Sequence, residues 1–202
     1  TRTGTATLTP TPTGTPTPTV TNTPTVTRTP TPNPDVEVDV FPEAQAELTL
    51  AMPDGRVETV WVSGSMTVHV FIPPTGAATD TDGDGLDQVR SEIVALTLTG
   101  NSALLGPLTV RLRDPAQQPF QRSLGEIEEQ VNNTPGVLDV PPFTPAGLAN
   151  SFFDLFFEVE AGGQVLHNAQ PASIQAVIDH KPPGPVTYSH LGALDLLDEN
   201  SN

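Results

Sequence analysis

One short segment of the chain combines residue types and spacing that suit a metal ion. Residues 80–87 read DTDGDGLD, with aspartate at the first, third, fifth and eighth positions. Calcium takes six to eight oxygen ligands on a tight but adaptable loop, and Gly85 permits the sharp bend that such a loop needs. We therefore expect a structural calcium site, although an acidic turn exposed to solvent remains the alternative. The predicted ligands are Asp80, Asp82, Asp84, the Leu86 carbonyl and Asp87.

The loop departs from the helical EF-hand at its far end. Position twelve of that motif holds an acid that binds calcium through both oxygens. Here Ser91 stands at that position and Glu92 comes one residue later. Asp87 resembles the next aspartate of thrombospondin type 3 and related extracellular repeats. The exact coordination is therefore left open.

The remaining polar residues do not form a catalytic motif. The four histidines are scattered, without the spacing of a zinc site, and Ser189-His190 is only a dipeptide. Cysteine is absent, which excludes disulfides and thiolate metal sites. We expect a protein that is not an enzyme.

The elements around the loop have the pattern of β-strands. Apolar or β-branched residues alternate with polar ones, and Gly, Pro or Asn separates the segments. Asp54-Gly55 and Gly162-Gly163 are hairpin signals. The expected strands are 36–41, 46–52, 56–62, 66–72, 92–100, 107–113, 151–161 and 173–180.

One segment favours a helix instead. Leu124, Ile127 and Val131 have helical spacing, and Ser123 is a candidate N-cap. The order strand, turn, strand, break, strand and double proline occurs in both halves of the chain. We therefore predict an all-β fold of two juxtaposed barrel-like or sandwich-like units with one short helix between them. The predicted units are residues 35–113 and 151–202, the second completed by a neighbour, with a connection at 114–150.

The first 34 residues have a different composition. All odd positions from Thr1 to Thr31 are threonine, and the even positions include many prolines. This composition is typical of extended, O-glycosylated stalks, and a disordered spacer is the simpler alternative. The threonines expected to carry glycans are Thr11, Thr13, Thr15, Thr17, Thr19, Thr21, Thr23, Thr25, Thr27, Thr29 and Thr31.

The start of this tail is the part that can act as a strand. Residues 1–9 contain no proline, so each amide there can donate to a β-ladder. Fully extended, the 34 tail residues span roughly 100 Å, which exceeds the diameter of about 40 Å expected for the body. We expect the tail to add a strand to another copy of the protein. The assembly residues are Thr1, Thr3, Thr5, Ala6, Thr7, Leu8 and Thr9.

Charge and hydropathy restrict which kinds of partner the protein can have. All 24 acidic residues lie in the body with six of the eight basic ones, which excludes nucleic acid as a main partner. No apolar run is long enough for a membrane helix. An acidic body suits a calcium-rich exterior, so we expect an extracellular or cell-surface location.

Together these features resemble a known class of protein. The Thr/Pro leader, the paired β-units, the calcium loop and the FFDLFFEVE (152–160) and LHNAQP (166–171) segments are similar to bacterial surface or environmental fibril subunits. Those subunits have juxtaposed tandem β-barrels and link head to tail through an N-terminal segment. The resemblance implies a linear homopolymer with bound calcium and O-glycosylated linker threonines. The alternative is a calcium-dependent carbohydrate-binding or adhesive module on a Thr/Pro stalk of a larger surface protein.

Overall fold

The computed structural model describes residues 35–52, 54–113, 121–190 and 195–197. The assembly residues predicted at 1–9 lie outside these ranges. So do the threonines predicted to carry glycans between 11 and 31.

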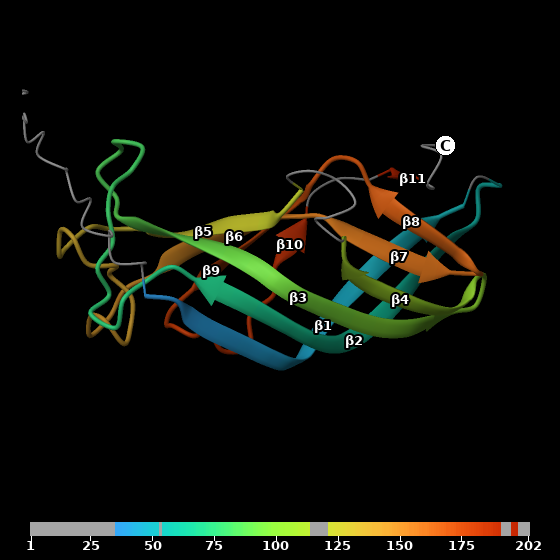
Figure 1. Cartoon of the computed structure of the whole chain (residues 1–202), viewed down its shortest axis with the longest axis horizontal. Coiled ribbons are helices and arrows are strands. Elements are labelled where there is room, and N and C mark those ends of the chain that lie inside the picture. The colour runs from blue at the N-terminus through green and yellow to red at the C-terminus, as the bar shows by residue number, and fades with distance from the viewer. Residues whose placement is uncertain (1–34, 53, 114–120, 191–194, 198–202) are drawn as a thin grey trace, which may run out of the picture. The chain divides into compact units, whose positions relative to one another are not determined.

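The described residues form one antiparallel sheet, which confirms the all-β prediction (Figure 1). None of them lies in a helix, and the structure therefore has no helix there that is long and apolar enough to cross a membrane. The strands are β1 Glu37–Ala51, β2 Val57–Val70, β3 Gln88–Ser102, β4 Gly106–Leu112, β5 Ser123–Glu129, β6 Ala149–Leu155, β7 Phe157–Ala161, β8 Gln164–Asn168, β9 Ala172–Ile178, β10 Ser189–His190 and β11 Leu196–Leu197.

The sheet is a meander in which several long strands are interrupted. After β1, β2 and β3, strands β4 and β5 lie end to end along the free side of β3: β4 pairs with residues 97–102 and β5 with residues 88–93. The same arrangement follows for β7 and β6, then for β8 and β9, and then for the two short strands β11 and β10. Figure 1 shows β5, β6 and β9 towards one end of the sheet and β4, β7 and β8 towards the other.

The interruptions form a line across the sheet. The ladder of β1 and β2 shifts between Phe41 and Ala44, and that of β2 and β3 shifts between Thr67 and Val68. Next along the line, β4 ends at Leu112 and β5 begins at Ser123, and a single residue, Phe156, separates β6 from β7. Bulges and breaks let a sheet bend, so the two ends of this sheet can curve separately.

The predicted helix is wrong. Residues 123–129 form β5, which pairs with β3 on one side and β6 on the other. Ser123, Ile127 and Glu129 face the interior, whereas the Leu124 side chain is half exposed. The short segment carried both periodicities, and two hydrogen-bonded neighbours decided between them.

The described strands do not form two separate barrels, because all of them join one sheet. The segments predicted as 56–62 and 66–72 are a single strand, β2, that runs through Gly64. A Cβ atom on Gly64 would lie 2.1 Å from the carbonyl oxygen of Thr97. Glycine therefore marks a close approach of β2 to β3 rather than a break.

The core lies on one face of this curved sheet. Its fully buried members include Val70, Ile72, Leu108, Leu138 and Val140, which come from strands and from the β2–β3 and β5–β6 connections. At the start of β1 the usual burial pattern is reversed, because a polar residue faces the interior and apolar residues face solvent. Asp39 is buried, while Val38 and Val40 are 52% and 62% exposed.

Candidate metal centre

The acidic loop is anchored at the start of β3. Thr79 and Gln88 exchange both backbone hydrogen bonds, at 3.2 and 3.3 Å, and so close the loop at its base. The buried side chain of Gln88 donates to Thr81 Oγ1 at 2.6 Å and accepts from the Thr81 amide at 3.2 Å. Hydrogen bonds thus hold the backbone at the two ends of the loop together.

Three of the predicted ligands come together. One carboxylate oxygen from each of Asp80, Asp82 and Asp84 lies within 4.8 Å of the others. Asp80 accepts from the amides of Gly83 at 2.6 Å and Gly85 at 3.0 Å, which coils the chain around its carboxylate. Gly83 and Gly85 have φ values of 86° and 95°, a region that favours glycine. Clustered carboxylates on such a coil are a donor set that calcium accepts.

The electrostatics of the loop suit a cation. The Gly83 amide lowers the pKa of Asp80 and so favours its charged form. On the adjacent strand β5, burial raises the pKa values of Glu126 and Glu128, and the loop aspartates raise them further. Five carboxylates therefore share one region of the surface, where a divalent cation would relieve their mutual repulsion.

Asp87 and Leu86 have different surroundings. Asp87 is 4% exposed, and its Oδ2 accepts from the Gly136 amide at 2.6 Å and from Asn132 Nδ2 at 3.2 Å. The half-buried Leu86 donates its amide to Asp84 Oδ1 at 2.9 Å. Ligand roles for the Asp87 carboxylate and the Leu86 carbonyl stay predictions.

A buried carboxylate holds the end of the loop through hydrogen bonds to backbone amides. Glu129 has no exposed surface; its Oε1 accepts from the Asp87 amide at 2.9 Å and its Oε2 from the Asp139 amide at 2.8 Å. Burial raises the pKa of Glu129, whereas these two amides lower it. Asn132 Nδ2 also donates to the Gly85 carbonyl at 3.1 Å. The connection after β5 thereby fixes the far side of the loop.

Sequence reasoning missed Glu126 and Glu128 as neighbours of the loop, because it predicted a helix for the segment that contains them. The signal that could have found them is the alternation of Leu124, Glu126 and Glu128, which has the period of a strand. Asn132 carried no such signal.

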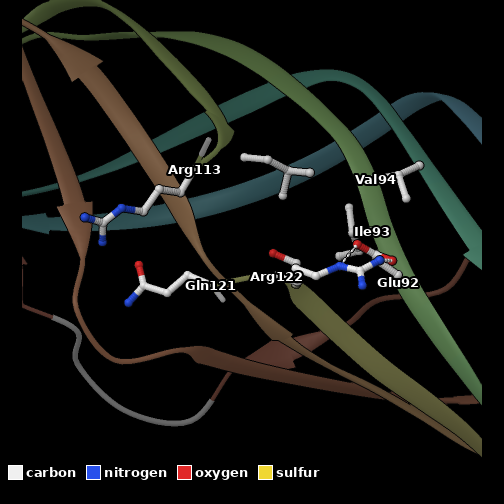
Figure 2. A pocket seen from close by; sticks show the side chains of 8 residues that line it. Glu92, Ile93, Val94, Arg113, Gln121 and Arg122 are labelled. Atoms are coloured by element: carbon white, nitrogen blue, oxygen red, sulfur yellow. Dashed lines mark hydrogen bonds and ion pairs between the residues drawn. The ribbon is translucent and has the colours of Figure 1, made fainter. Parts of the chain in front are cut away.

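A separate hollow of about 220 Å³ lies on the line of interruptions (Figure 2). Arg122 pairs with Glu92 on one side of it, and Figure 2 shows Arg113 and Gln121 pointing away from that pair. Ser123 is the one lining residue with a hydroxyl, and its Oγ accepts from the Phe156 amide at 3.0 Å. This hydroxyl joins β5 to the break between β6 and β7.

The structure therefore defines an all-β protein with an open antiparallel sheet and an acidic loop at the start of its third strand. No family model and no curated protein matches the sequence. Among solved structures, the chain is similar to DynF from the dynemicin biosynthesis pathway of Micromonospora chersina, with a TM-score of 0.59 and 20% sequence identity. The match covers 83% of this chain and 73% of DynF. At this identity the likeness shows a shared fold.

Proposed function

We propose that the protein is a non-enzymatic structural subunit of an extracellular filament, polymerising head to tail through its N-terminal segment. The main support is the last edge of the sheet. Among the described residues, Ser189–His190 pair with β9 and Leu196–Leu197 pair with β8. β9 has seven residues and β8 has five, so most of this edge has no partner strand within the described part of the chain. Such an edge can accept a strand from a neighbour.

The position of the tail fits this assembly. In the sequence the tail precedes β1, which among the described strands pairs only with β2 and so forms the first edge of the sheet. A segment that leaves one edge and joins the other edge of the next copy makes a contact between two different surfaces. Contacts of that kind produce open linear polymers.

Calcium would have a structural role in this subunit. The ion would be held by Asp80, Asp82 and Asp84 and would stiffen the loop between β2 and β3. Calcium present at 100 times its dissociation constant would stabilise the fold by about 2.7 kcal/mol, which corresponds to a rise in melting temperature of about 5–11 °C. Replacing Asp82 and Asp84 together by asparagine should abolish this rise. Asp54→Asn, in the exposed β1–β2 turn, is the matched control and should retain it.

Sedimentation velocity tests the filament proposal. The full chain should form large polymers that electron microscopy shows as filaments, and the chain without residues 1–34 should stay monomeric. The described residues belong to one compact unit, so we expect the shortened chain to fold. A full chain that remains monomeric with calcium at millimolar concentration would contradict the proposal.

One observation favours the alternative, a calcium-dependent carbohydrate-binding or adhesive module. Trp61 lies on β2 opposite Glu47 and is 65% exposed, and an exposed indole ring can stack on a sugar. This reading requires glycan binding that calcium promotes and that Trp61→Ala removes. Binding of that kind by a monomeric chain would replace the filament account.

A further inference from the structure

Lys181 is the only lysine in the chain; the other seven basic residues are arginines. Its side chain is fully buried, and its Nζ directly contacts Oδ2 of Asp39, whose side chain is 3% exposed. Glu37 lies two residues earlier on the same face of β1, with its Oε1 3.9 Å from the same Nζ. A lone lysine is thus held, out of water, against two carboxyl groups.

The cross-strand neighbours of the two carboxyl groups are apolar. In the ladder between β1 and β2, Asp39 lies opposite Val68 and Glu37 opposite Val70, and both valines are buried. The Lys181 amide donates to the Pro141 carbonyl at 2.6 Å, which fixes the backbone that carries the amine. Burying an ion pair costs desolvation energy that the attraction often fails to repay. Stability alone therefore gives little reason to keep a charged pair here.

We propose that Lys181 and Asp39 become joined by an intramolecular isopeptide bond, with Glu37 as the acid–base group. The neutral Nζ attacks Cγ of Asp39, the C–N bond forms, and one carboxyl oxygen of Asp39 leaves. An ammonium and a carboxylate become one amide and one water: two of the three ammonium protons depart with the oxygen, and one stays on nitrogen. The step is a condensation, so it requires neither an oxidant nor a cofactor.

The chemistry of each residue type suits the role proposed for it in this reaction. A lysine amine can lose its proton and attack a carbonyl carbon, whereas a guanidinium does not deprotonate in proteins. Glu37 can take a proton from Nζ and pass it to the leaving oxygen. Burial raises the pKa of Glu37, although the Lys181 cation opposes that shift, so this carboxyl group is suited to carry a proton. One third of the Glu37 side chain is exposed, which gives the water a way out.

The bond would close the fold covalently. Asp39 lies on the first strand, and Lys181 follows β9, 142 residues later in the sequence. The link would hold these distant parts of the sheet together in a chain that has no cysteine for a disulfide. This inference stands independently of the filament, since a monomer would contain the same bond.

Mass spectrometry of the folded full chain tests the proposal. We expect a mass lower than that of the sequence by one water molecule, and a branched peptide that joins the Asp39 region to the Lys181 region. Asp-Gly pairs, present at 54–55, 82–83 and 84–85, can lose the same mass as succinimides. Hydroxylamine cleaves succinimides and leaves an isopeptide amide intact, so the branched peptide must survive that treatment.

Amine labelling gives a second readout, because Lys181 is the sole lysine. After denaturation, a cross-linked chain should take one label, at its N-terminus, and an unlinked chain two. A folded protein of unmodified mass that takes two labels would overturn the proposal.

Substitutions of Lys181, Asp39 and Glu37 test the role proposed for each of these residues. Lys181→Arg and Asp39→Ala should retain the unmodified mass. Glu37→Gln, which keeps the size of the side chain, should leave most chains unlinked, and the exposed Glu47→Gln should link fully as the matched control. Full linkage in a folded Glu37→Gln chain would overturn the role of Glu37.

Discussion

Replacing Glu129 by glutamine should destabilise the protein through one specific contact. Both carboxylate oxygens of Glu129 accept buried backbone amides, from Asp87 and from Asp139. Glutamine offers one oxygen and one NH2 group, so one of these two amides would face a donor. A buried donor without a partner costs about 1–3 kcal/mol. Removing the buried charge offsets part of this cost, which leaves a net loss of about 1–2 kcal/mol.

For a chain of this length, that loss corresponds to a melting temperature lower by about 2–8 °C. Differential scanning calorimetry in the presence of a calcium chelator measures it without a contribution from metal binding. Glu47→Gln makes the same change of charge at an exposed position of β1 and should change the melting temperature by less than about 2 °C. Equal melting temperatures for the two variants would refute the assigned role of Glu129.

Three further changes test the sheet. Gly64→Ala should cost about 1–3 kcal/mol in urea unfolding, because its Cβ would lie 2.1 Å from the Thr97 oxygen, whereas the exposed Ser65→Ala should have little effect. Asn168→Ala should cost about 1–3 kcal/mol, because this buried amide satisfies backbone groups on both sides of the break between β6 and β7; unchanged stability would contradict that role. The pKa of Glu58 lies below its ordinary value of 4.5, chiefly because of a hydrogen bond from Ser102, the last residue of β3. Its stabilisation should therefore be present above pH 4.5 and be lost as the pH falls through the lowered pKa, and Glu58→Gln should show no such loss in urea midpoints measured across that range.

Much of the fold could be predicted from alternation, because most strands bury one face. What alternation could not show is where a strand continues. Gly64 and the serines beside it have the composition of a break, yet the backbone of β3 requires a residue without a side chain there. The sequence predicts a helix over residues 123–133, because the seven residues that form β5 fit either period, and only pairing with β3 and β6 decides the outcome.

The candidate metal site likewise has one part that the sequence could predict and one part that it could not. Asp80, Asp82 and Asp84 could be identified because their spacing along the chain is itself the geometry of a coil around an ion. Glu126 and Glu128 interact electrostatically with the loop aspartates from a neighbouring strand, and Lys181 contacts Asp39 from 142 residues away. Contacts of this kind depend on sheet register, which a single sequence does not contain.

Disulfide trapping tests most directly the central claim, that the tail of one copy completes the sheet of the next. The natural chain has no cysteine, so Thr5→Cys in the tail and Val177→Cys on β9 would introduce the only two thiols. Under mild oxidation, the double variant should give a ladder of covalent oligomers on a non-reducing gel, whereas each single variant should give dimers at most. A double variant that stays monomeric, whether unlinked or linked within its own chain, would contradict strand donation between copies.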